Sequence, residues 1–524
     1  MSQFYFILLQ IGTFSNDQQL SLETYSPSWN ASCSRPESCT ECPALITTKS
    51  RYMLQATSQS DPATLIAFLP IHLQGDDQYK CGKLHLGSLY RALAITYTLQ
   101  NLSPTPFNLR GMILDTCSNS LRIDQDLYNI LASGKLCNTK ANFDGVINNS
   151  TVGGVITESS EDVMAANRII APLKIPLVGS FSTSSVFNNK FAYPYLARTI
   201  SPDTQETQVI ADILKHQNWT YVSVVYSKEV YGLNGYKNFK KQAGAAGVCI
   251  ATSISIQNQG SLDEIKNALS QLTLQDGAHI VVVIALNPRP ILDAANALGI
   301  LKQFLWIGTE TWGRWTSILN GLENDLIGSI SIAMRNTMVT RFNNFLKSLT
   351  YVNRRGVPDD WFEEFYQQIH KCKLSNAVTV YTEYPPCSLS EKVTDEKLEM
   401  DKYIIYTTIA AAYSVASGIN RAKNSKCPTK TRFEDCFNDN DNREYLFQML
   451  LDTKWSGWTD DSGYDLTFNN DRYWDVGYDI FNFVEINGTY IYKKVNESLI
   501  SLSINNRVVV TLIVSWLDLQ LPVQ

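Results

Sequence analysis

The chain has 524 residues, of which 44% are hydrophobic and 18% charged, and its net charge is −6. This is ordinary globular composition, enough for roughly two to four structural units that each bury a core. The acidic balance and the lack of a long basic run argue against a nucleic-acid-binding protein.

The two ends of the chain predict little folded structure. Residues 1–64 are rich in Ser, Thr and Pro, and we interpret them as a leader and a flexible N-terminal segment. We interpret Cys33, Cys39 and Cys42 as a local disulfide staple, because no second pair at metal-site spacing and no histidine lies nearby. Residues 506–524 are predicted to form a tail. Their apolar run meets Asp518 too soon to span a bilayer, so we expect no transmembrane helix in this chain.

From Leu65 onward, short apolar runs alternate with amphipathic stretches. The first series predicts strands at 65–71, 109–114, 153–157, 176–179 and 196–200, with a helix at 84–99. The second predicts helices at 204–216, 236–246, 262–274 and 290–298, with strands at 221–226, 249–255, 280–286 and 304–308. Helices at 400–419 and 443–451 follow, and then strands at 478–483 and 490–493. This alternation predicts doubly wound parallel sheets, and there are too many units for one sheet, so we expect two α/β lobes.

Cysteines and glycosylation sequons together indicate an oxidising, extracellular setting. The chain has 11 cysteines. Its sequons begin at Asn30, Asn101, Asn148, Asn149, Asn218, Asn487 and Asn496.

Four polar residues follow the ends of predicted strands. They are two hydroxyls, Ser160 and Thr183, one carboxylate, Asp203, and one phenol, Tyr231. Hydroxyls at a helix start suit an anion, while a carboxylate and an aromatic face suit an ammonium group, so the set resembles a clamp for an amino acid. The alternative is that Ser160 and Asp203 only cap helices and Thr183 is an ordinary loop residue.

Several longer runs resemble a known receptor family. Three of these runs are Asn218–Tyr226, Tyr231-Gly232 and Gly247–Ala251. Further runs are Ile175-Pro176 and Arg198–Asp203 before them, and Trp306–Trp312 and Gly477–Ile480 after them. Over roughly residues 65–495 the chain resembles the Venus-flytrap ectodomain of class C G-protein-coupled receptors, nearest to the metabotropic glutamate receptors.

The resemblance implies a fold and a division into domains. The fold would be two doubly wound α/β lobes joined by a hinge, as in type I periplasmic-binding proteins. Lobe 1 would comprise residues 65–200 and 339–475, and lobe 2 residues 201–338 and 476–505.

The resemblance also implies roles for the cysteines. Cys137 lies where such receptors carry an inter-subunit disulfide, and Cys249 matches a cysteine that pairs with a cysteine-rich domain beyond this chain. The implied intrachain pairs are Cys81 with Cys117, Cys372 with Cys387, and Cys427 with Cys436.

In the implied ligand site, Ser160 and Thr183 hold an α-carboxylate, while Asp203, Tyr231 and Glu310 hold the α-ammonium. Glu310 stands where the family has aspartate, and a solvated loop acid is the alternative for it. Arg91 matches an arginine that binds a side-chain carboxylate, with a plain surface arginine as the alternative. Two further cation positions of the family fall at Asn438 and at Trp315, which is next to Arg314. The missing cations weaken the case for glutamate itself, so the implied ligand is glutamate or a related amino acid, with a neutral or other amino acid as the alternative.

The implied function is binding by closure of the cleft, not catalysis. No nucleophile elbow, zinc-protease motif, phosphate loop or dinucleotide fingerprint occurs, so we expect neither an enzyme nor a cofactor or metal. The resemblance implies a homodimer through lobe 1 at the outer face of the plasma membrane, and a G protein as partner only if a membrane domain lies outside this chain. The alternatives are a secreted, non-signalling decoy that binds amino acids, and the ectodomain of a peptide-binding guanylyl-cyclase receptor.

Overall fold

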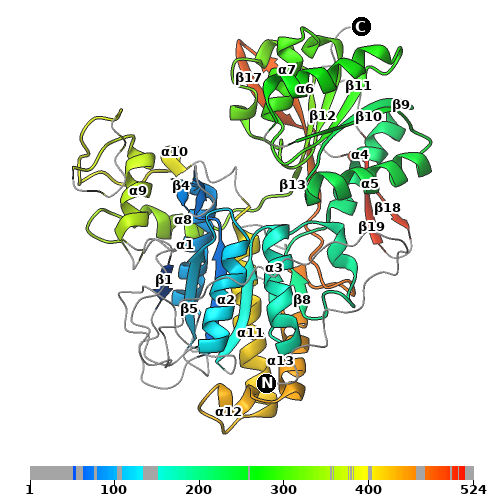
Figure 1. Cartoon of the computed structure of the whole chain (residues 1–524). Helices are drawn as coiled ribbons and strands as arrows, with labels where there is room; N and C mark the ends of the chain where they lie inside the picture. Colours follow the sequence, from blue (N-terminus) through cyan, green and yellow to red (C-terminus); the bar gives the residue numbers. More distant parts are fainter. Residues whose placement is uncertain are drawn as a thin grey trace, which may run out of the picture. The chain divides into compact units, whose positions relative to one another are not determined.

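The computed structural model of the chain describes residues 51–54, 63–75, 80–102, 109–133, 151–257, 260–354, 357, 359–375, 377, 381, 383–398, 404–455, 466–495, 498–504 and 507–513. Within these residues, two mainly parallel β-sheets are each covered on both faces by helices (Figure 1). The predicted α/β class with two doubly wound lobes is therefore confirmed.

The first sheet has six strands in the order β1-β5-β2-β6-β7-β8, and all neighbours are parallel except β1 and β5. Its central strands β2 and β6 are buried along their whole length, as their apolar sequences predict. The bounds are β1 (Arg51–Leu54), β2 (Thr64–Leu69), β5 (Arg110–Asp115), β6 (Val152–Thr157), β7 (Leu177–Gly179) and β8 (Leu196–Arg198).

The prediction of a flexible segment up to residue 64 is wrong at β1. Residues 51–54 pair antiparallel with β5, whose edge would otherwise carry unpaired backbone groups.

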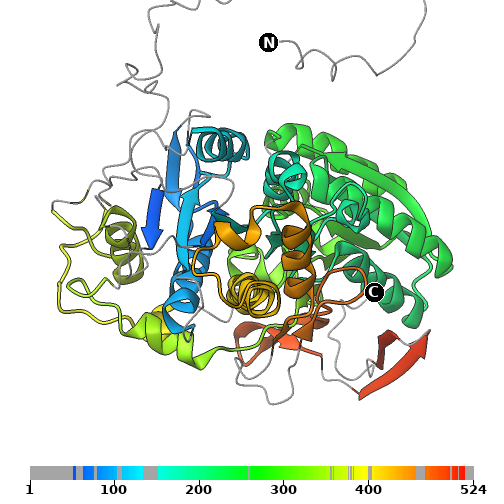
Figure 2. The same cartoon turned by 90° about the horizontal axis from the view of Figure 1, so that it is seen from below.

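Helices cover both faces of the first sheet. Helices α2 (Leu121–Ser133) and α3 (Ser160–Ile170) lie side by side on one face, and α1 (Leu86–Asn101) and α11 (Tyr406–Lys426) pack on the other (Figure 1). Two glycines of β6 allow α11 to approach closely: a Cβ at Gly153 would lie 2.7 Å from Ile419, and one at Gly154 2.8 Å from Val415. The next long helix, α13 (Asn440–Leu451), lies beside α11 (Figure 2).

The second sheet has seven strands in the order β10-β9-β11-β12-β13-β16-β17, of which the first five are parallel and the last two antiparallel. Helices α4 (Asp203–His216) and α5 (Val230–Ala245) cover one face, and α6 (Leu262–Leu269) and α7 (Arg289–Ala297) the other. The strand bounds are β9 (Tyr221–Ser227), β10 (Cys249–Ile256), β11 (Ile280–Ile284), β12 (Leu305–Gly308), β13 (Ile330–Met334), β16 (Tyr478–Ile486) and β17 (Thr489–Lys494).

Smaller elements complete the described chain. Strand β19 falls within the tail predicted at 506–524, where it pairs with β18, so the tail is not free of regular structure. The remaining bounds are β3 (His72–Gln74), β4 (Cys81–Leu84), α8 (Thr340–Lys347), α9 (Asp359–His370), α10 (Asp395–Leu398), α12 (Glu434–Phe437), β14 (Lys454–Trp455), β15 (Leu466–Thr467), β18 (Ser498–Ile504) and β19 (Arg507–Ile513). No helix in these ranges is long and apolar enough to cross a bilayer.

The chain passes between the two sheets three times, and hydrogen bonds tie the crossings together. The first crossing links β8 to α4, the second β13 to α8, and the third leads into β16. The Ser201 hydroxyl donates to the Trp474 carbonyl oxygen (3.2 Å) and accepts from the Val476 amide (2.9 Å), which joins the first and third crossings. The Arg335 amide donates to the Gly477 carbonyl oxygen (3.1 Å), which joins the second and third. These segments therefore form one connected hinge.

The three implied intrachain disulfides are confirmed. Cys81 bonds to Cys117, Cys372 to Cys387, and Cys427 to Cys436. Cys249 is unbonded and exposed at the first residue of β10. Cys33, Cys39, Cys42 and Cys137 lie outside the described residues.

A buried histidine fastens α9 to the first sheet. His72 Nδ1 lies 2.5 Å from Asp115 Oδ2, and His72 Nε2 lies 3.5 Å from Glu364 Oε2. Burial, the largest influence, lowers the pKa of His72, but its hydrogen bonds and charge interactions with Asp115 and Glu364 together raise the pKa to about 9. The imidazolium thus links β3, the end of β5 and α9.

This histidine predicts a loss of stability at alkaline pH. Because the folded pKa of about 9 lies above the unfolded value near 6.5, the stabilisation is complete below pH 6.5 and disappears as pH rises through 9. We expect the free energy of unfolding to fall by roughly 2 to 3 kcal/mol from this group between pH 7 and 10. Chemical denaturation of His72→Gln should show a shallower alkaline decline, whereas His216→Gln, on an exposed site, should follow the wild type. Equal declines in all three proteins would contradict the assignment.

Candidate functional site

The predicted site residues lie at the carboxyl ends of the parallel strands in both sheets. Ser160 opens α3 after β6, Thr183 follows β7, and Asp203 opens α4 after β8. On the second sheet, Tyr231 follows β9 in the first turn of α5, and Glu310 follows β12. Ligands of open α/β sheets bind at this edge, so the chain order places all five at a suitable position.

On the first lobe, the start of α3 is firmly fixed. Ser159, not Ser160, is the N-cap: its hydroxyl accepts from the Asp162 amide (3.1 Å), and the Asp162 carboxylate accepts from the Ser159 amide (3.2 Å). The simple capping alternative for Ser160 is therefore wrong. Ser160 is buried in the first helical turn, where backbone amides and the helix dipole favour an anion.

Thr183 is held next to Asp203. The Asp203 amide donates to the Thr183 carbonyl oxygen (2.8 Å), and both side chains are buried. The guanidinium of Arg198, 1% exposed, donates to the carbonyl oxygen of Ser184 (3.1 Å) and, through its other terminal nitrogen, to Asn188 Oδ1 (2.6 Å). This buried cation fixes the loop that carries Thr183.

On the second lobe, three carboxyl groups converge. One oxygen each of Asp203, Glu206 and Glu310 lies within 4.8 Å of the others. The Glu310 amide and the Tyr231 hydroxyl (3.3 Å) donate to the two carboxylate oxygens of Glu206. Asp203 and Glu206 are each 1% exposed and Glu310 is half-buried, so two of the three acids are shielded from water.

Burial and mutual repulsion make these acids hard to ionise. Burial raises the pKa of Asp203 to about 6, against the opposing effects of Thr183 and Arg198. Burial and the Asp203 charge raise the pKa of Glu206 to about 8. Burial, with the charges of Glu206 and Asp203, also holds the pKa of Glu310 well above its usual range. A bound cation would reverse this by favouring the ionised forms.

Several polar atoms of the cluster are buried with no hydrogen-bond partner among the described residues. They are both carboxylate oxygens of Asp203, Oε2 of Glu310 and the hydroxyl of Tyr478. An unsatisfied buried polar atom costs about 1 to 3 kcal/mol, so several at one point indicate a place that a ligand completes. The donor chemistry of carboxylates specifies a cation, either a metal ion or an ammonium group.

Arg91 is not an exposed surface residue. It is 5% exposed, its Nη1 lies 2.5 Å from Glu158 Oε1, and its guanidinium lies 4.6 Å from the ring centre of Phe181. Ser88 donates to the same Glu158 oxygen (3.1 Å). The charge of Arg91 is therefore already matched by Glu158, which weakens the interpretation that it binds a carboxylate of the ligand.

A cavity of about 480 Å³ lies between the lobes next to Ser160. Its lobe 1 wall includes three residues at the start of α3, and Glu229 and Leu286 form its lobe 2 wall. The described residues that line it are Pro70, Gln74, Ser118, Asn119, Ser120, Leu121, Ser159, Glu161, Asp162, Glu229 and Leu286.

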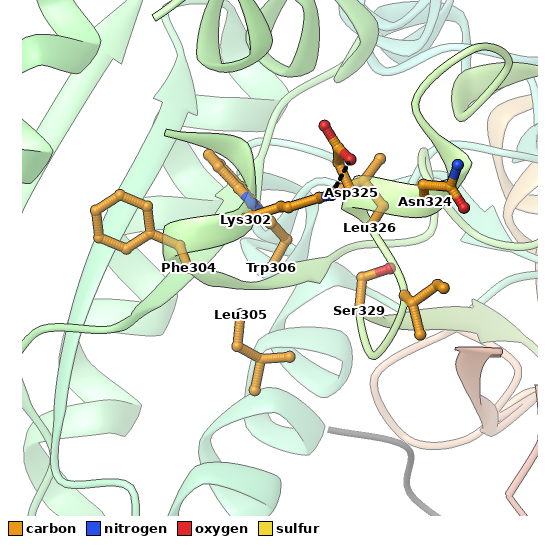
Figure 3. Close-up of a pocket in the computed structure, with 9 residues that line it drawn as sticks. Lys302, Phe304, Leu305, Trp306, Asn324, Asp325, Leu326 and Ser329 are labelled. Carbon is orange, nitrogen blue, oxygen red and sulfur yellow. Dashed lines mark ion pairs between the residues drawn. The ribbon is translucent and has the colours of Figure 1, made fainter. Parts of the chain in front are cut away.

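A second cavity, of about 330 Å³, lies away from the predicted residues. It is formed at the start of β12 and just before β13, and the ion pair between Lys302 and Asp325 (2.9 Å) crosses it (Figure 3). Because it lies at the amino ends of the strands, it lacks the position expected of a ligand site in such a sheet.

The structure thus brings Asp203, Tyr231 and Glu310 together and places Thr183 beside them. Sequence reasoning missed Glu206, which stands one helical turn after Asp203. The signal was the Asp-x-x-Glu spacing at the start of α4, which puts both acids on one helix face. It also missed Glu158, the partner of Arg91.

Comparison with known proteins places the chain in a family. A family model described as "Receptor family ligand binding region" matches residues 90–486. The chain belongs to this family of receptor ligand-binding regions. The predicted resemblance to the Venus-flytrap ectodomains of class C receptors is confirmed by this match together with the relatives that follow.

Three curated relatives are metabotropic glutamate receptors. The chain is 26% identical over 452 residues to metabotropic glutamate receptor 4 of Mus musculus, covering 83% of this chain and 49% of that receptor. It is 28% identical over 449 residues to metabotropic glutamate receptor 8 of Homo sapiens (82% and 48%). It is 26% identical over 453 residues to metabotropic glutamate receptor 6 of Oryctolagus cuniculus (81% and 51%). The chain spans about half the length of these receptors.

The acid cluster predicts a pH-dependent effect of Glu206→Gln. The pKa of Glu206 is about 8 in the folded protein and near 4.5 in the unfolded chain. The unfolded chain therefore loses its proton first, and the free energy of unfolding falls as pH rises from about 4.5 to about 8. The side-chain amide of the glutamine has an oxygen that can accept from the Glu310 backbone amide. Its NH2 group can donate to the Tyr231 hydroxyl oxygen. We expect the unliganded variant to be more stable than wild type by about 2 kcal/mol at pH 8.5 and equal to it at pH 5.

Chemical denaturation at the two pH values measures this difference. Glu485→Gln, an exposed change on β16, is the matched control and should leave stability unchanged at both. Destabilisation by Glu206→Gln at pH 8.5 would show that the three acids do not repel one another.

Proposed function

We propose that this chain is the extracellular ligand-binding region of a receptor resembling the metabotropic glutamate receptors, and that it binds an amino acid between its two lobes. The observation that carries the proposal is the cluster of buried Asp203 and Glu206 with half-buried Glu310, together with its unsatisfied oxygen atoms. Three disulfides are consistent with an oxidising compartment.

The cluster suits an α-ammonium group. Such a group has three N–H donors and one positive charge, and the unsatisfied oxygens of Asp203 and Glu310 supply acceptors for it. Charge-assisted hydrogen bonds of this kind are about twice as strong as neutral ones. The buried ring of Tyr231 would add a cation–π contact and close the pocket to water.

The α-carboxylate would then face the first lobe. Ser160 at the start of α3 and Thr183 after β7 each carry a hydroxyl donor at the same edge of the sheet. Because Thr183 is bonded through its backbone to Asp203, the groups for the two ends of the ligand backbone are adjacent. This spacing would select an α-amino acid over a simple amine or acid.

Binding would be coupled to closure of the lobes. Thr183 and Asp203 are adjacent, whereas Ser160 comes from lobe 1 and Tyr231 and Glu310 come from the second sheet, so the full set of contacts forms only when the lobes approach. One direct contact between lobes is Asn238 Nδ2 donating to Ser185 Oγ (2.8 Å). The ligand shifts the open–closed equilibrium by the difference between its affinities for the two forms.

Assembly belongs to the same proposal. We infer a homodimer through lobe 1, where α2 exposes Leu121 (63%) and Tyr128 (69%). In a receptor at the cell surface, closure of the lobes in each protomer would then change the relative orientation of the two protomers. A G protein would respond only through a membrane domain outside this chain.

Binding should depend on Asp203. We expect calorimetry to show that at least one of the twenty amino acids binds the purified protein. Asp203→Asn should lower the affinity for that amino acid by about 100-fold, because a buried charge pair is lost. Thr183→Ala should weaken it by about tenfold, the value of one hydrogen bond to a charged group.

The control is Asp212→Asn, an equally small change farther along α4, whose side chain accepts from Gln208 (2.9 Å). It should bind as wild type does. Thermal unfolding confirms that each variant is folded before titration. If no amino acid binds at millimolar concentration, or if Asp203→Asn binds normally while folded, the proposal is wrong.

The dimer should dissociate when the α2 surface is charged. We expect sedimentation of the protein with Leu121→Glu and Tyr128→Glu together to give monomers, because two carboxylates would be buried in an apolar interface. Leu274→Glu, on a lobe 2 site that is 74% exposed, is the matched control and should remain dimeric. Monomers in the wild type at micromolar concentration would refute the inferred assembly.

A further inference from the structure

The cavity between the lobes is lined by acids on both sides. Glu161 and Asp162 contribute from lobe 1 and Glu229 from lobe 2, and no lysine or arginine is among the described residues that line it. Together with Asp203, Glu206 and Glu310, six carboxyl groups lie along the two facing edges. An amino acid with a neutral or acidic side chain does not account for this excess.

Glu229 presents an unused oxygen to this space. Its Oε1 accepts from the Ser227 hydroxyl (2.5 Å) and from the Gly232 amide (3.2 Å), which fixes the side chain as the N-cap of α5. Its Oε2 is buried without a hydrogen-bond partner among the described residues. One half of the carboxylate is thus structural, and the other half is free for a ligand.

Glu161, an exposed residue in the first turn of α3, lines the same cavity from the other lobe. Burial and the negative charge of Glu229 both raise the pKa of Glu161. Since closure brings α3 and α5 together, the two carboxyl groups repel each other more strongly in a closed, empty cleft. A positive group between them would convert this repulsion into attraction.

Two buried cations of lobe 1 near the cleft are already committed. Arg91 is paired with Glu158 at 2.5 Å. Arg198 donates to backbone carbonyl oxygens and to Asn188. On lobe 2, the Arg314 guanidinium lies 5.2 Å from the ring centre of Phe481. A ligand carboxylate between Glu161 and Glu229 would therefore meet acids, and neither Arg91 nor Arg198 would be available to pair with it.

Hydrogen bonds connect the two acidic groups along the edge of the second sheet. Ser227, which binds Glu229, also accepts from the Leu286 amide (3.1 Å). The neighbouring carbonyl oxygen, of Ala285, accepts from the Thr311 hydroxyl (2.7 Å). Thr311 follows Glu310, so hydrogen bonds join the loops that carry both acidic groups.

We propose that the ligand is a basic amino acid, whose α-ammonium lies among Asp203, Glu206 and Glu310 and whose side-chain cation lies between Glu161 and Glu229. This inference rests on the function proposed above and specifies the ligand class for the same site. The side-chain cation bridges the two lobes, so it stabilises the closed form more than the open one. A glutamate side chain in that position would add a third negative charge and oppose closure.

Calorimetry with lysine, norleucine and glutamate tests this inference, because norleucine has the length of lysine without its charge. We expect lysine to bind at least about 30-fold more tightly than either, the effect of one buried charge pair. Glu229→Gln keeps an acceptor for the Gly232 amide. It should lower the affinity for lysine about tenfold and leave the affinity for norleucine unchanged. Glu161→Gln should do the same and does not depend on the α5 cap. Glu485→Gln is the control and should change neither.

The outcomes separate this inference from the proposed function. If norleucine or glutamate binds as tightly as lysine, the inference of a basic ligand is wrong, while the proposal of amino-acid binding stands. If no amino acid binds, both fail. If calcium chloride alone gives a saturable signal and lysine gives none, the carboxylates form a metal site and the inference is overturned.

Discussion

One buried guanidinium positions most of what surrounds the cleft. Arg198 donates to carbonyl oxygens of the loop that carries Thr183 and to Asn188, while its own backbone pairs with Arg472 and Trp474 of the third crossing. A buried cation costs several kcal/mol unless its donors are satisfied, so these partners cannot move independently of it. Because Arg198 is also the charge that opposes the raised pKa of Asp203, the same group sets both the geometry and the electrostatics at the start of α4.

The two lobes contribute unlike chemistry to one opening. Lobe 1 supplies hydroxyls, the start of α3 and Arg91, whose charge is already paired with Glu158. Lobe 2 supplies acids and aromatic rings. The three acids repel one another when ionised, and either protonation or a neighbouring cation relieves this repulsion. Glu158 pairs with Arg91, so the charge of this arginine does not offset the acids of lobe 2.

Local patterns and the family resemblance predicted much of this arrangement. Wholly apolar strands such as β2 and β11 were evident because central parallel strands are buried on both faces. The disulfides followed from the resemblance, not from spacing. Glu206 was missed because a helix-start acid has an ordinary local explanation, and it joins the site only where the loop after β12, far along the chain, packs over it. Likewise no local signal indicates that β1 completes the edge of β5, or that Arg91 finds Glu158; these depend on contacts between distant segments.

The three crossings have a consequence for the order in which the protein is made. Helix α11, which covers one face of the first sheet, is synthesised only after the parallel core of the second sheet, and that sheet in turn waits for β16 and β17 near residue 494. The first sheet therefore keeps one face partly uncovered until α11 has been synthesised, and the second sheet keeps its β13 edge unpaired until β16 has been synthesised. Both lobes are completed late relative to the synthesis of their first strands, and surface that is buried in the finished fold stays exposed in that interval.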